Sequence, residues 1–126
     1  MREMVTLSTG LIDHGQLYDE ARYIQEVLVG AGVKTVSICC AFGVDVDHPL
    51  FAKNVQVEIG RLTEFLRRHE DAETFHLGSV NITLTYDYKG LKFYFGNDCD
   101  VFCEGEESPQ LSDVRERWAM RYPLRN

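Results

Sequence analysis

The sequence predicts an α+β fold: a single domain over residues 1–126, in which a mostly antiparallel sheet packs helices against one face. Three observations lead to this prediction. The length of 126 residues suits one domain. Apolar and polar residues alternate from 80 to 95, as in a β-hairpin, and the segments 15–29 and 109–122 carry apolar residues at helical spacing. The expected order is β-α-β-α-β-β-β-α, ending in a three-stranded meander before the last helix.

The first third of the chain predicts a strand, a helix and a second strand. Residues 4–8 form a short strand, and Asp13 caps a helix over 15–29, with Gln16 completing a capping box. Residues 33–42 form a strand with small or apolar residues on both faces, including Phe42 beside Val36, Ile38 and Cys40, so we expect it in the centre of the sheet. If 4–8 pairs with it, the unit is a βαβ crossover.

A second helix is expected over about 49–70. Pro49 suits its first turn, because the N–H groups there form no hydrogen bond within the helix and proline lacks an N–H. Its buried stripe would consist of Phe51, Val55, Ile59, Leu62 and Leu66.

The segment 80–95 predicts a hairpin in which Lys89-Gly90 is a two-residue turn. This turn places 88 opposite 91, 86 opposite 93, and 84 opposite 95. All six residues are apolar or aromatic and share one face, so turn length and hydrophobic pattern agree on the register.

The last helix is expected to begin at Ser108-Pro109 and to run to about 122. Together with the other elements it defines a predicted core, consisting of Ile24, Leu28, Val36, Ile38, Val55, Ile59, Leu62, Leu84, Tyr86, Phe93, Phe95, Val101, Leu111, Val114 and Trp118.

Charge and composition restrict the function classes. The chain carries 20 acidic and 13 basic residues, a net charge of −7, which argues against nucleic acid as a partner and suits a basic protein partner. We find no signal-peptide pattern and no apolar run long enough to span a membrane, so we expect a cytoplasmic protein that does not bind membranes. The four cysteines are expected to be thiols.

The stretch NDCDVFCEGEE, residues 97–107, contains five carboxylates and two cysteines. An EF-hand loop fails here, because Phe102, Cys103 and Pro109 occupy positions that need an oxygen ligand, glycine and glutamate. A strand over 99–104 would hold Cys99 and Cys103 about 13 Å apart, too far for a disulfide. We therefore expect both cysteines, with Val101, on the inner face, and no metal site or cofactor.

The other face of that strand is the candidate partner-binding surface, an aromatic group among carboxylates. Its predicted residues are Tyr94, Asp98, Asp100, Phe102, Glu104, Glu106 and Glu107. Aromatic anchors with a polar rim are typical of protein interfaces. Carboxylates on an edge strand also prevent edge-to-edge pairing, which is the alternative interpretation. Phe102 favours the interface, because edge protection does not require it.

Other residues that could take part in catalysis or metal binding also have a structural explanation. Cys39 or Cys40 could act as a nucleophile, and the Asp45–His48 loop could hold a metal; buried thiols and a loop with a helix cap account for them equally well. Arg115, Arg117, Arg121 and Arg125 are expected on the solvated face of the last helix.

Since no catalytic constellation stands out, the sequence predicts a small acidic binding protein rather than an enzyme. In size, acidity and lack of a catalytic motif it resembles the small bacterial immunity proteins, a similarity that includes no shared motif. The resemblance implies an inhibitor that occludes the active site of a basic, nuclease-type toxin. Two alternatives stay open: a type III-like secretion chaperone acting as a homodimer, and a small enzyme using Cys39, Cys40 or the Asp45–His48 loop. The oligomeric state is not predicted.

Overall fold

The protein has a six-stranded antiparallel sheet and three helices, seen in a computed structural model that describes residues 3–123. The elements in chain order are β1 (Met4–Ser8), α1 (His14–Gly30), β2 (Thr35–Cys40), β3 (Asn54–Glu58), a 3₁₀ turn (Ile59–Arg61), α2 (Leu62–Asp71), β4 (Ile82–Thr85), β5 (Lys92–Phe95), β6 (Val101–Glu106) and α3 (Pro109–Arg121). The order of strands in the sheet is β1-β6-β5-β4-β2-β3.

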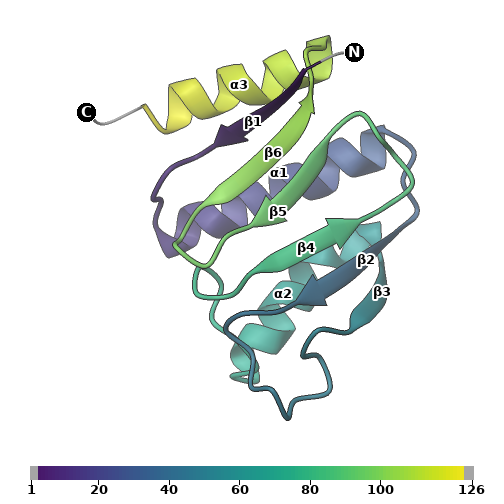
Figure 1. Cartoon of the computed structure of the whole chain (residues 1–126), viewed down its shortest axis with the longest axis vertical. Helices are drawn as coiled ribbons and strands as arrows, with labels where there is room; N and C mark the ends of the chain where they lie inside the picture. The colour runs from purple at the N-terminus through teal and green to yellow at the C-terminus, as the bar shows by residue number, and fades with distance from the viewer. Residues whose placement is uncertain (1–2, 124–126) are drawn as a thin grey trace.

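The predicted fold class is confirmed, since α1 and α2 lie behind the sheet, and β4, β5 and β6 form a meander (Figure 1). The third helix, α3, packs beside α1, because Trp118 of α3 donates a hydrogen bond to Glu20 of α1. None of the described helices has the length and apolarity needed to cross a membrane.

Local signals set the starts of α1 and α3, at the caps Asp13 and Ser108 that the sequence predicted. The Asp13 side chain accepts from the backbone N–H of Gln16 at 2.8 Å, and the Gln16 side chain accepts from the N–H of Asp13 at 2.9 Å. Ser108 caps α3 in the same way, accepting from the N–H of Leu111 at 3.1 Å. These contacts use N–H groups that would otherwise lack an acceptor at the start of a helix.

The prediction of one helix over 49–70 is wrong in its first half. Residues 54–58 form β3, which pairs with β2 so that Val55 lies opposite Ile38 and Val57 opposite Val36. The β-branched Val55 and Val57 alternate with polar residues, and pairing with β2 half-buries both. The helix begins only at Leu62 and buries Leu62, Phe65 and Leu66.

Residues 4–8 do not pair with the strand at 33–42, and that pairing was the condition for a βαβ crossover. β1 pairs with β6 at the opposite edge of the sheet, while β2 lies between β4 and β3. Both β1 and β2 are antiparallel to their neighbours, so the sheet contains no βαβ unit. β2 ends at Cys40, and the ring of Phe42, expected on its inner face, is 68% exposed.

The hairpin forms with the predicted face but not the predicted register. Phe95 lies opposite Ile82 rather than Leu84, a shift of two residues that keeps the same side chains inside. The Tyr86 hydroxyl explains the wider loop. It donates to the carbonyl of Leu91 at 2.6 Å and accepts from the N–H of Phe93 at 3.1 Å. The side chain thus satisfies two backbone groups that would otherwise form hydrogen bonds with a neighbouring strand.

The core lies between the sheet and the helices. Thirteen of the fifteen predicted core residues are buried, the exceptions being Val55 and Tyr86, which are half-buried and pack against the core. Val55 lies on the edge strand β3, where no further strand covers it.

Candidate functional site

The face of the sheet that no helix covers is the candidate site, because it gathers the aromatic and acidic residues predicted to bind a partner. Along β6, Val101, Cys103 and Gly105 are buried, whereas Phe102 and Glu104 are half-buried on the open face. The strand lies between β1 and β5, so it is not an edge. Protection of an edge strand therefore does not explain its carboxylates.

Tyr94 and Phe102 form a stacked aromatic pair on this open face. The register of β5 and β6 places them directly opposite each other. Their ring centroids lie 4.9 Å apart with 12° between the planes. The Tyr94 hydroxyl donates to Glu104 Oε1 at 3.2 Å, which holds a carboxylate at the edge of the pair. Burial, and then the charge of Glu104, raise the pKa of the Tyr94 phenol, so the hydroxyl remains a donor.

A third aromatic residue, Phe42, lines the same surface hollow as this pair. The hollow has a volume of about 450 Å³, and its lining includes Phe42, Asn81, Tyr94 and Phe102. The chain after β2 is held there by two backbone hydrogen bonds, from Ala41 to Asn81 and from Asn81 to Phe42. Phe42 was not predicted as a site residue, because its position continues the inward pattern of β2.

Two carboxylates complete the hollow. Asp98 and Asp100 both line it, and they belong to the loop between β5 and β6. Gly96 makes room for this arrangement, since a Cβ there would overlap Asp100 Oδ1 and Phe102 Cε2. Asp100 Oδ1 is buried and finds no hydrogen-bond partner among residues 3–123. Burial, followed by the charge of Asp98, raises the pKa of Asp100, and no basic side chain among residues 3–123 offsets them.

The remaining predicted residues lie away from the hollow. Glu106 is exposed at the far end of β6, opposite Met4 of β1. Glu107 follows the strand and forms a two-point ion pair with Arg115 of α3, which lowers the pKa of the Glu107 carboxyl. The structure thus brings Tyr94, Asp98, Asp100, Phe102 and Glu104 together, and it separates Glu106 and Glu107 from them.

The two cysteines of the stretch 97–107 do not share one strand face as predicted. Cys103 is buried in the core, but Cys99 lies before β6 with φ of 55°. Its N–H donates to the carbonyl of Gly78, and its own carbonyl accepts from Ile12 at 2.9 Å. Cys99 therefore belongs to a loop junction, and all four cysteines are free thiols.

The sites considered for an enzyme have local structural roles. Cys40 is buried, and burial, followed by the charge of Cys39, raises the pKa of its thiol to about 11, which disfavours the thiolate that a nucleophile needs. In the Asp45–His48 loop, Asp45 accepts from the N–H of Asp47 at 3.0 Å and His48 Nδ1 accepts from the N–H of Leu50 at 3.0 Å. These side chains shape their own turn.

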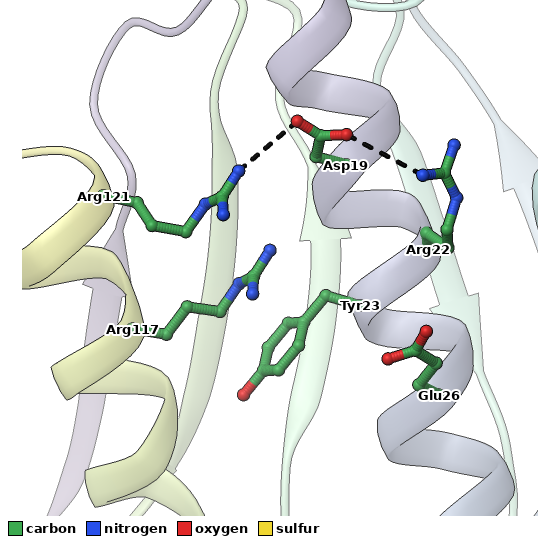
Figure 2. Close-up of a pocket in the computed structure, with 6 residues that line it drawn as sticks. All are labelled: Asp19, Arg22, Tyr23, Glu26, Arg117 and Arg121. Atoms are coloured by element: carbon green, nitrogen blue, oxygen red, sulfur yellow. Dashed lines mark hydrogen bonds and ion pairs between the residues drawn. The ribbon is translucent and has the colours of Figure 1, made fainter.

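A second hollow lies between α1 and α3, lined by Asp19, Arg22, Tyr23, Glu26, Arg117 and Arg121. Figure 2 shows Asp19 between the guanidinium groups of Arg121 and Arg22, at 3.3 Å and 3.9 Å. The Arg117 guanidinium lies 4.2 Å from the centre of the Tyr23 ring. The expectation of a solvated arginine face is wrong for Arg117, whose side chain is only 24% exposed, whereas Arg121 is exposed while it pairs with Asp19. Arg125 lies outside the described residues.

No protein-family model matches this sequence, and comparison with curated proteins and with solved structures yields no significant match.

Proposed function

We propose that the protein is a non-catalytic binding protein that takes a basic segment of a partner protein onto its open sheet face. The observation that carries the proposal is the stacked pair of Tyr94 and Phe102, half-exposed beside the exposed Phe42 and bordered by Asp98, Asp100 and Glu104. Aromatic anchors surrounded by polar groups carry most of the binding energy in protein interfaces.

The chemistry of the hollow favours lysine or arginine from the partner. A guanidinium or ammonium group placed against the face of an aromatic ring gains cation–π attraction. Asp100 offers a carboxylate that no cation within the described part of the chain compensates. The net charge of −7 would speed the approach of a basic partner. Ions in solution screen this attraction, so we expect the association rate to fall as salt increases.

Within this proposal, the specific role that we favour is an immunity-type inhibitor of a basic, nuclease-type toxin. Side chains that bind phosphate in a nuclease are lysines and arginines, and the carboxylates at the hollow present the same charge as phosphate groups. Inhibition would then be occlusion of the toxin's active site, with no reaction performed by this chain.

Toxicity rescue tests this role. Each open reading frame adjacent to the gene in the native host is expressed alone and together with this protein, and growth is measured. One toxic product should be neutralised by the wild type, and it should bind the purified protein in calorimetry. Phe102→Ala should weaken that binding by at least about 2 kcal/mol.

Asp100→Lys and Glu58→Lys form a matched pair for the same test. Each changes the net charge equally and each lies on the open side of the sheet, but Glu58 is on the far edge strand β3. The proposal predicts that only Asp100→Lys abolishes rescue. Equal rescue by both variants, or no rescue of any toxic neighbour, would remove the immunity role.

The secretion-chaperone alternative makes a different prediction about assembly. A chaperone of that kind acts as a homodimer around an extended effector segment, so light scattering of the purified protein separates the two roles. A monomer that binds a folded toxin supports the inhibitor. A stable dimer that binds only an unfolded segment supports the chaperone.

A further inference from the structure

Two histidines and a glutamate converge on the helix-covered side of the molecule. His14 is the first residue of α1, Glu70 lies in the last turn of α2, and His76 lies in the loop that follows. His14 Nε2 lies 2.6 Å from Glu70 Oε2, and His76 Nδ1 lies 3.1 Å from the same oxygen. The start of α1 and the segment 70–76 thus bring two imidazole nitrogens to one carboxylate oxygen.

The spacing of these atoms fits a small divalent ion after minor adjustment. One ligand atom from each residue lies within 4.8 Å of the others. In a tetrahedral zinc site with bonds of about 2.0–2.1 Å, neighbouring ligand atoms are separated by roughly 3.3 Å. Imidazole nitrogen and carboxylate oxygen are both common zinc ligands, and the histidines are 45% and 66% exposed, so an ion can enter from solvent.

Tyr18 orients the carboxylate by binding the oxygen that the histidines do not contact. Its hydroxyl donates to Glu70 Oε1 at 2.6 Å, which leaves Oε2 facing both imidazoles. Tyr18 is buried, and the guanidinium of Arg67 lies 4.0 Å from the centre of its ring. Hydrogen-bond partners of a metal ligand fix its orientation and increase the affinity of the site for the metal.

Contacts at both oxygens fix the position of the Glu70 carboxylate, with Tyr18 at Oε1 and the two histidines at Oε2. The rings of His14 and His76 are stacked, with centroids 4.9 Å apart and 16° between the planes. The stacking holds the two imidazoles next to each other beside the Glu70 carboxylate.

We propose that His14, Glu70 and His76 form a three-ligand zinc site, whose fourth position is open to water or to a donor from a partner. The ion would join the start of α1 to the end of α2. The site uses none of the residues on the open sheet face, so it stands or falls independently of the proposed function.

Zinc titration of the untagged protein by calorimetry at pH 7.5 tests the site, together with the visible absorption of the Co²⁺ form. We expect one ion per chain and a Co²⁺ spectrum of low coordination number. His76→Ala and the double variant His14→Ala/His76→Ala should lose binding, and Tyr18→Phe should bind roughly 10–100-fold more weakly.

His48→Ala is the matched control, because it removes a histidine from a loop outside the cluster and should bind zinc as the wild type does. Circular dichroism shows whether each variant folds. Because the His76 side chain is exposed, we expect the single variant His76→Ala to fold and to give a valid binding measurement. No zinc binding by the wild type, or equal binding by the wild type and a folded His76→Ala variant, would overturn the proposal.

Discussion

The indole Nε1 of Trp118 donates a 2.7 Å hydrogen bond to Glu20, a carboxylate that is completely buried between α1 and α3. The same carboxylate accepts from Arg117 at 3.0 Å and 3.2 Å and from the hydroxyl of Tyr122. Burial, and then the hydrogen bond to Glu20, raise the pKa of Tyr122 to about 12. A buried carboxylate is tolerated because every one of these donors points at it.

Glu20→Ala should therefore destabilise the protein by about 3 kcal/mol, since it leaves a guanidinium and an indole N–H without their buried acceptor. Urea denaturation measures the change. Glu20→Gln, which keeps an acceptor but loses the charge, should lie between Glu20→Ala and the wild type. Glu26→Ala, at an exposed position of the same helix, is the control and should change stability by less than about 0.5 kcal/mol. Equal midpoints for Glu20→Ala and Glu26→Ala would contradict this account.

Tyr86→Phe should destabilise the protein by about 1–2 kcal/mol, because the Tyr86 hydroxyl bonds two backbone groups of the β5 segment. Tyr88→Phe is a matched control in the same loop, since the described residues give the Tyr88 hydroxyl no hydrogen-bond partner. Thermal unfolding of the two variants provides the comparison. If both variants melt together, the hydroxyl of Tyr86 is not what sets the hairpin register.

Tyr86 also shows where sequence-based prediction reached its limit. The alternation of apolar residues fixes which side chains face the core, and that part of the prediction is confirmed. A shift of two residues preserves the alternation, so the pattern cannot distinguish Ile82 from Leu84 as the partner of Phe95. Only a hydrogen bond from a side chain to the backbone of the next strand separates the two registers.

The segment 51–66 was ambiguous for a similar reason. Val55, Ile59, Leu62 and Leu66 fit helical spacing, while Val55 and Val57 also fit the period of a strand. Pairing with β2 stabilises the strand rather than the helix, and this contact between separate segments cannot be recognised from the local sequence pattern. By contrast, Asp13 and Ser108 act on N–H groups within three residues, so both helix starts were predictable.

Some contacts of the candidate site were predictable from the sequence and others were not, for the same reason. The stacking of Tyr94 on Phe102 follows from the alternation along β5 and along residues 101–104 of β6, which was predicted correctly. Phe42 joins them only through the loop after β2, and the cluster of His14, Glu70 and His76 draws on two separate segments. Neither arrangement has a spacing along the chain that would reveal it.

Asp100→Asn should stabilise the protein at neutral pH while weakening partner binding. Because the pKa of Asp100 is raised, the folded state favours its protonated form. The protonated Asp100 carboxyl therefore contributes its full stabilisation at acidic pH, and this stabilisation is lost as the pH rises through the raised pKa. The group is partly exposed, so the gain at pH 7 should stay below about 1 kcal/mol. Calorimetric melting at pH 7 and pH 3 measures it: the variant should exceed the wild type at pH 7 and match it at pH 3. A less stable variant at pH 7 would mean that the charge of Asp100 supports the fold.

The reactivity of the four thiols distinguishes a binding protein from a cysteine-dependent enzyme. Cys40 and Cys103 are buried, and burial raises their pKa values to about 11 and about 12, whereas Cys39 and Cys99 are half-buried. At pH 8 iodoacetamide should modify Cys39 and Cys99 first and reach Cys40 and Cys103 only after unfolding in urea, since the thiolate is the reactive form. Peptide mass spectrometry over a time course identifies the modified residue. The Cys39→Ser variant is the control, because it removes the neighbour of Cys40 without touching the core. Rapid modification of Cys40 in the folded protein would show an activated thiol and would favour the enzyme instead.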